Sequence, residues 1–172
     1  MKAPPINLAV WAGDNVVWIK ISGRASFTSS VDFKTLITQL WEKGYGRFVL
    51  DLTDCLLMDS TFLGVLAGLG LKFNHARDGG INASIELLNP NPRISDLLEN
   101  LGVAHLFGRT TEPRPCAHQL AAIDPSLAGA NRQEISRTCL EAHQTLMDIN
   151  PANIPKFKDV ALFLSEDLKK LE

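Results

Sequence analysis

The residues best suited to chemistry form a short polar cluster between two apolar stretches. Met58-Asp59-Ser60-Thr61 follows the apolar run 48–52 and precedes the uncharged stretch 62–71. Asp, Ser and Thr are favoured N-cap residues, so the cluster predicts the start of a helix. The hydroxyl of Ser60 could accept a phosphate there, because free backbone N–H groups and the helix dipole favour negative charge. Its simplest role is a helix cap, and a third possibility is a nucleophile.

A serine hydrolase is the enzyme class that this cluster could support. Ser60 and Asp59 would need a histidine base, and the chain offers His75, His105, His118 and His143. Ser60 lacks the Gly-x-Ser-x-Gly elbow, and none of these histidines stands in a recognisable catalytic motif. We therefore expect no enzyme, and labelling of Ser60 by a serine-reactive phosphonate would argue otherwise.

Cysteine and histidine pairs raise the question of a metal site. Cys116-Ala-His118 and the i,i+4 pair Cys139 and His143 could together supply four zinc ligands. Their spacing matches no compact zinc knuckle, so buried thiols and surface histidines are the favoured interpretation. The sequence predicts no metal and no cofactor.

Composition excludes several function classes. The chain has 172 residues and a formal net charge of −2, with Lys and Arg dispersed along it. Nucleic-acid binding needs a basic patch, so no direct contact with DNA is expected. The N-terminus lacks the apolar core of a secretory signal, and no stretch is long and apolar enough to span a membrane. The three cysteines suggest no disulfide framework. We expect a cytoplasmic protein without a membrane span.

Strands and helices alternate around the cluster. A hairpin of strands 8–11 and 16–21 is followed by a helix that begins at Ser29 or Ser30 and ends at Gly44. The strand 48–52 and the central helix come next, and Gly64 and Gly68 would let that helix approach a sheet closely. Strand 81–88, a helix capped by Asn91-Pro92 and ended by Gly102, strand 103–107 and a last helix 115–123 complete the order. This predicts an α/β fold: a small mixed sheet of about five strands with packed helices, parallel after the hairpin.

The C-terminal part is predicted to be an extension of that domain. Residues 1–123 form the α/β domain, and residues 124–172 form a linker and two helices. Asn131 with Glu134 resembles a capping box, and Ile135, Cys139, Ala142, Leu146 and Ile149 form an apolar stripe. Asn150-Pro151 ends this helix and Pro155 opens another, which makes an αα-hairpin. The hairpin packs either on its own domain, in a homodimer contact through residues 131–171, or against a partner.

The central motif resembles that of the STAS domain of bacterial anti-sigma factor antagonists. The resemblance rests on Met58-Asp59-Ser60-Thr61 followed by Leu63-Gly64-Val65-Leu66, and extends to Ile21-Ser-Gly-Arg24 and to the turn and helix between Leu88 and Gly102. In that family the serine after the aspartate is phosphorylated, which implies phosphorylation at Ser60. The partner-binding residues implied are Asp59, Ser60, Thr61, Phe62, Gly64 and Arg24. Phe62 departs from the pattern, since the family usually has Gly there.

The resemblance also implies partners and a mode of action. A serine kinase of the anti-sigma type would bind the unphosphorylated form, and a phosphatase would restore it. The alternative is a STAS-like scaffold, in a signalling or lipid-transport assembly, that no longer switches and binds through the C-terminal hairpin. Partner binding that is unchanged by the substitution Ser60→Asp would favour the scaffold.

Overall fold

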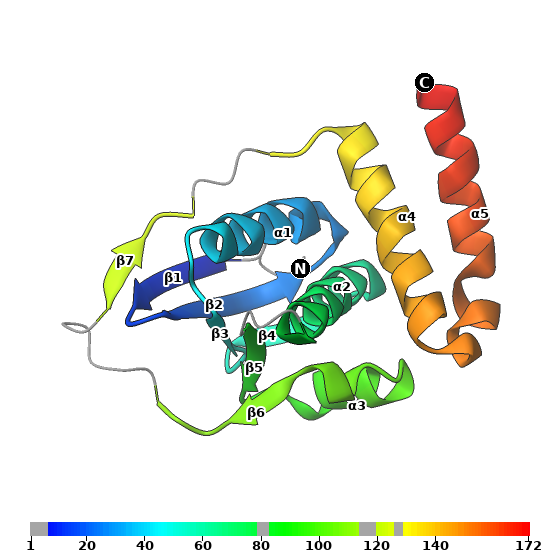
Figure 1. The fold of residues 1–172 in the computed structure, drawn as a ribbon. Coiled ribbons are helices and arrows are strands. Elements are labelled where there is room, and N and C mark those ends of the chain that lie inside the picture. The colour runs from blue at the N-terminus through cyan, green and yellow to red at the C-terminus, as the bar shows by residue number, and fades with distance from the viewer. Residues whose placement is uncertain (1–6, 79–82, 114–119, 126–128) are drawn as a thin grey trace.

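The computed structural model describes residues 7–78, 83–113, 120–125 and 129–172. Within them, seven strands form one mixed sheet (Figure 1). The main path of the sheet has the order β6-β5-β3-β2-β1-β7, and β4 pairs with the end of β2. The strands are β1 (Asn7–Gly13), β2 (Val16–Ala25), β3 (Arg47–Asp51), β4 (Cys55–Met58), β5 (Ser84–Leu88), β6 (Gly108–Thr110) and β7 (Ala121–Ile123).

The helices lie at the sheet and at the C-terminal end of the chain. They are α1 (Phe27–Glu42), α2 (Ser60–Asp78), α3 (Pro92–Asn100), α4 (Arg132–Ile149) and α5 (Ile154–Leu171), with short 3-10 helices η1 (Ala104–Leu106) and η3 (Pro151–Asn153). Among the described residues, no helix combines the length and apolar character needed to cross a membrane.

The predicted α/β class and its strand directions are confirmed. β1 and β2 form the antiparallel hairpin, and β3, β5 and β6 extend the sheet from β2 in parallel. The turn residues Asp14 and Asn15 both have positive φ, as a tight hairpin turn requires. Alternate residues of the central strands, such as Ile19 and Leu50, are fully buried in the same core cluster as α1 and α2.

Several predicted boundaries are wrong. The expected strand 103–107 is mostly the 3-10 helix η1, and the strand that pairs with β5 begins only at Gly108. The expected helix 115–123 falls partly outside the described residues, and its end is β7, which pairs with β1. α1 begins at Phe27 instead of at Ser29 or Ser30, because these two hydroxyls bond back to the carbonyls of Ser26 and Phe27 inside the first turn.

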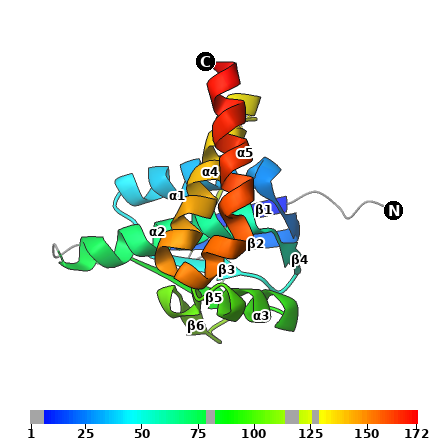
Figure 2. The same ribbon diagram turned by 90° about the vertical axis from the view of Figure 1, so that its right-hand side faces the viewer.

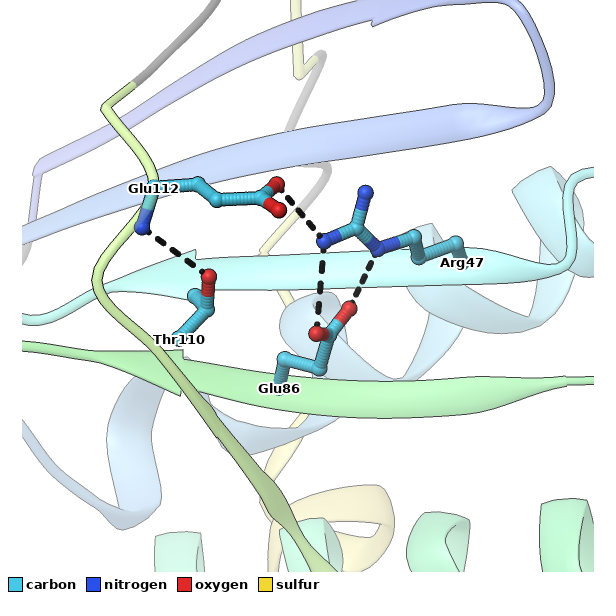
Figure 3. A network of polar contacts seen from close by, with 4 residues as sticks. All are labelled: Arg47, Glu86, Thr110 and Glu112. Carbon is cyan, nitrogen blue, oxygen red and sulfur yellow. Dashed lines mark hydrogen bonds and ion pairs between the residues drawn. The ribbon is translucent and has the colours of Figure 1, made fainter.

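An ion-pair network joins β3 and β5 to the chain that follows β6 (Figure 3). Arg47 on β3 forms a two-pronged pair with Glu86 on β5, and its guanidinium also lies 3.2 Å from a carboxylate oxygen of Glu112. The hydrogen bonds that the guanidinium donates to the Glu86 carboxylate are the main cause that raises the pKa of Arg47 above its usual value. The network fixes parallel neighbours β3 and β5 in register and holds the chain after β6 against them.

The predicted αα-hairpin is present, and it packs on its own domain. α4 begins with the expected capping box, in which Asn131 and Glu134 bond each other's backbone N–H groups. Figures 1 and 2 show α4 between α2 and α5, and α4 contacts both α2 and α1. The buried Asn153 fixes the turn between α4 and α5, since its side-chain amide donates to the carbonyls of Leu101 and Leu146 at 2.9 and 2.8 Å.

Candidate functional site

Asp59 organises the predicted site because its carboxylate caps two helices. One oxygen accepts the backbone N–H of Phe62 at 2.8 Å, which is the N-cap bond predicted for α2. The other accepts the backbone N–H of Phe27, the first residue of α1, at 2.7 Å. The backbone N–H of Asp59 donates to Ala25 at the end of β2. Both helix N-termini and the ends of β2 and β4 are therefore fixed around one side chain.

Ser60 is the first residue of α2 and is half-buried under α4. Its Oγ lies 2.9 Å from Nε2 of His143, a residue of α4 that is only 5% exposed. Nδ1 of His143 lies 2.6 Å from the carbonyl oxygen of Cys139. A carbonyl oxygen can only accept a hydrogen bond, so Nδ1 carries a proton. In the neutral ring, Nε2 has no proton and accepts a hydrogen bond from the hydroxyl group of Ser60. The ring of Phe157 on α5 packs against the imidazole at a centroid distance of 5.0 Å.

Thr61 also faces α4. Its side chain is buried and hydrogen-bonds the thiol of Cys139. Burial raises the pKa of that thiol, while the bond from Thr61 lowers it and the nearby charge of Asp59 raises it. The Cys139 side chain is thus a neutral, buried group in the interface between α2 and α4.

Gly64 marks the closest approach of the two helices. A Cβ atom at this position would lie 2.5 Å from the carbonyl oxygen of Ala142 and 2.7 Å from its Cβ. The prediction that Gly64 and Gly68 face a sheet is wrong for Gly64, because the backbone it admits belongs to α4. At Gly68 the nearest atom to an added Cβ is a methyl group of Thr145 at 3.9 Å, so the contact there is loose.

The remaining predicted partner-binding residues point in different directions. Phe62 is fully buried in the core and packs on Phe33 with ring centroids 4.7 Å apart, so its side chain turns away from Ser60 and presents no surface to a partner. Arg24 is exposed on β2 beside Leu57 of β4, close in sequence to Ala25, which contacts Asp59. Next to this edge, the side chains of Phe27 and Leu56 are about half exposed, at 46% and 51%.

The metal and hydrolase hypotheses can be placed on this geometry. Cys116 and His118 lie outside the described residues, while Cys139 contacts Thr61 and His143 contacts Ser60. Within the described ranges, no group of three or more His, Cys, Asp or Glu residues could hold a metal ion. Ser60 and His143 do form a serine–histidine pair, but the histidine Nδ1 bonds a backbone carbonyl where a catalytic triad has a carboxylate. Asp59 is used in capping.

A cavity of about 640 Å³ lies at the other end of α2. Arg47, Glu86 and His105 line it, together with Phe73 and Asn74 of α2. No pattern in the sequence groups these residues, since they come from separate elements. The guanidinium of Arg47 is already paired with two carboxylates, so Arg47 offers no free cation to the cavity.

Sequence reasoning missed the contact between Ser60 and His143. The two residues are 83 positions apart, and only the apolar stripe of α4 indicated that this helix has a packing face. The interpretation of His143 as a surface histidine is wrong, since this residue is 5% exposed. Its position one turn after Cys139 and next to Ala142 of the stripe was the available signal.

Comparison with known proteins places this geometry in a family. Residues 8–115 match the STAS domain, a segment that contains the whole α1–α3 region and ends before α4. Among solved structures, the unphosphorylated anti-sigma factor antagonist SpoIIAA aligns at 17% identity and a TM-score of 0.51, covering 63% of this chain and 90% of that one. An anti-sigma factor antagonist from Mycobacterium paratuberculosis gives the same identity and TM-score and covers 63% of this chain and 87% of that one. No match was found among curated proteins. The matched segment covers more than half of the chain, and it carries Ser60 at the head of α2 in the STAS arrangement of strand and helix, so this protein belongs to the STAS domain family.

Proposed function

We propose that the chain is a protein-binding regulatory module of the anti-sigma factor antagonist type, switched by phosphorylation of Ser60. The observation that carries the proposal is the position of Ser60: first residue of α2, directly after the Asp59 cap, inside the matched STAS segment. The two structural neighbours named above are anti-sigma factor antagonists. The partners would be a serine kinase that binds the unphosphorylated form and a phosphatase that restores it, with ATP belonging to the kinase.

Phosphorylation would act on binding more than on folding. A phosphate adds about −1.5 to −2 charges and stands at a helix N-terminus, where the helix dipole favours it. The Asp59 carboxylate beside it already has its two backbone donors. A partner that buries Ser60 would have to desolvate the new dianion, which costs several kcal/mol without a matching Arg or Lys. Release of that partner is the expected result.

The test is a pull-down from the native host with wild type, Ser60→Ala and Ser60→Asp as baits. Capture of an ATP-binding kinase by the first two baits and its loss with Ser60→Asp, together with phosphate on Ser60, would support the proposal. Ser26→Asp is the matched control, because it places the same charge at the N-cap of α1, where Asp is also a good cap. Equal capture by all baits, with Ser60 never modified, would contradict the switch.

The proposal makes the protein a non-enzyme, and the Ser60–His143 pair gives the hydrolase alternative a specific test. An activated serine reacts with a fluorophosphonate probe. We expect no labelling of Ser60 in wild type and the same result in His143→Ala. Labelling that is lost in His143→Ala would overturn this part of the proposal.

A second candidate is a STAS scaffold that binds through its hairpin, and the outer face of α5 favours it. Val160, Leu162 and Phe163 are exposed there, Phe163 at 67%. Since α4 is packed on the domain, the predicted homodimer contact through residues 131–171 would fall to this face of α5. Sedimentation velocity over a range of concentrations tests it: Phe163→Glu should abolish any dimer, and the exposed Lys158→Glu should not.

A further inference from the structure

The feature that the proposed function leaves unexplained is the helix lying over its own switch residue. α4 crosses the first turns of α2, and its residues Cys139, Ala142 and His143 are each at most 8% exposed. They face Thr61, Gly64 and Ser60 respectively. Three of the residues predicted to bind a partner are thus already in contact with the same chain.

The fit between the two helices leaves no room for a second protein. The carbonyl of Ala142 lies so close to Gly64 that a side chain at position 64 would clash with it. A kinase must reach the hydroxyl of Ser60 directly to transfer a phosphoryl group in line. With His143 bonded to that hydroxyl, the enzyme and α4 would compete for the same position.

We propose that the α4–α5 hairpin is a cis-acting cover of the protein-binding face of the STAS domain, and that it must leave Ser60 before a partner can bind. The inference rests on the proposed function in one respect, that Ser60 is where the partner acts. We expect the partner to bind this surface with a helix, because the segment that covers it here, α4, is a helix. α4 presents small and apolar side chains at helical spacing to the groove between α1 and α2.

The way the hairpin is attached is consistent with removal. The matched segment 8–115 holds α1–α3 and the sheet apart from β7, and the hairpin does not belong to it. From α4, only Ala142 and Leu146 are buried members of the main core among the described residues. At the rim, Lys34 and Glu141 form an exposed pair at 3.5 Å, a kind of contact that contributes little. A cavity of about 220 Å³ lies beside the contact between α2 and α4, and Gly64, Gly68, Lys72 and Thr145 are among the residues that line it.

The Ser60–His143 bond connects the cover to the switch. A phosphate on Ser60 removes the hydroxyl group that donates a hydrogen bond to His143. It also adds bulk where α2 and α4 touch. Phosphorylation of Ser60 therefore disfavours a seated α4. The kinase would act on the open form, and the phosphate would then keep the hairpin open.

Cysteine labelling of the full chain tests the cover without any partner. Cys139 is shielded by α4 docking, while Cys55 is shielded by the core of the domain and serves as an internal reference. Gly64→Ala inserts a Cβ against Ala142, and Gly68→Ala makes the same change one turn later, where the space is free. N-ethylmaleimide modification of each cysteine is followed by peptide mass spectrometry.

We expect Cys139 to react at least about tenfold faster in Gly64→Ala than in wild type, a factor that reflects a modest loss of docking free energy. Gly68→Ala should match wild type, and Cys55 should be unchanged in both. Ala142→Leu places a larger side chain in the same contact from the α4 side. It is used in place of Gly64→Ala if that variant does not fold. Cys139 still protected in these variants, or Cys139 and Cys55 exposed together, would overturn the cover. Cys139 exposed alone, with Ser60 never phosphorylated in the host, would leave the cover standing and refute the switch.

Discussion

At the scale of single residues, Asp59 has the largest structural role in the candidate site. It was predicted as an N-cap and as a partner-binding residue, and its carboxylate caps both α2 and α1. Replacing it with Ala leaves two helix N–H groups without this acceptor, so we expect Asp59→Ala to lower the free energy of unfolding by about 2 kcal/mol. Urea denaturation measures this value.

Asp54→Ala is the control for that experiment. Asp54 lies between β3 and β4, and its carboxylate pairs with Lys20 at 2.8 Å, with both side chains partly exposed. Such a surface pair contributes little, so the expected change is about 0.5 kcal/mol or less. An equal loss in the free energy of unfolding in the two variants would mean that the two capping bonds of Asp59 contribute no more to stability than the surface ion pair of Asp54.

Cys55 gives the protein a pH dependence on the alkaline side. Burial raises the pKa of its thiol from 9.0 to about 11. The unfolded chain releases the proton near pH 9 while the folded protein keeps it, so the stabilisation is complete below pH 9 and is lost as pH rises towards 11. In Cys55→Ala, the free energy of unfolding should fall less steeply between pH 9 and 11 than in wild type. Parallel curves from urea titrations at each pH would contradict this assignment.

At the scale of elements, the helices with local start signals were the predictable ones. Asn91 accepts the N–H of Ile94 with Pro92 in the first turn, and Asn131 and Glu134 form their box, as the sequence alone indicated. The short strands β4, β6 and β7 escaped prediction because three or four residues carry no period. They are strands because neighbours β2, β5 and β1 supply their backbone partners.

The turn between α4 and α5 is where the hairpin is tied most firmly to the domain. The amide of Asn153 is fully buried and serves carbonyls of both Leu101 and Leu146. Asn153→Ala would leave both carbonyls without this donor, and we expect a loss of about 1–3 kcal/mol in thermal or urea unfolding.

Lys156→Ala is the matched control for Asn153→Ala. Lys156 also bonds a carbonyl of the domain, that of Asn100 at 3.2 Å, but in an exposed position. The expected loss is within about 0.5 kcal/mol. A larger loss in Lys156→Ala than in Asn153→Ala would show that the buried amide is not the anchor.

At the scale of the whole molecule, the sequence predicted the class of fold and the existence of the hairpin, but not how they meet. The strand–helix alternation and the motif around Ser60 are local patterns, and they were sufficient for the STAS domain. The contact of His143 with Ser60 joins distant parts of the chain, and the packing of Gly64 on Ala142 depends on the angle between two helices. Neither can be read from periodicity, because an apolar stripe indicates that a face is buried without indicating against what.

This arrangement predicts a gradient of local stability across the molecule. Most residues of the central strands β2 and β3 are buried, whereas α5 packs mainly on α4 and exposes several apolar side chains. Segments with few buried contacts open at lower free energy than the core. In hydrogen exchange followed by mass spectrometry, amides of α5 should exchange first, those of α4 next, and those of β2 and β3 last. Low concentrations of urea should leave this order unchanged, because the hairpin would open before the sheet unfolds. If α4 and α5 exchange only together with the sheet, the hairpin is an inseparable part of one cooperative unit and cannot open by itself at Ser60.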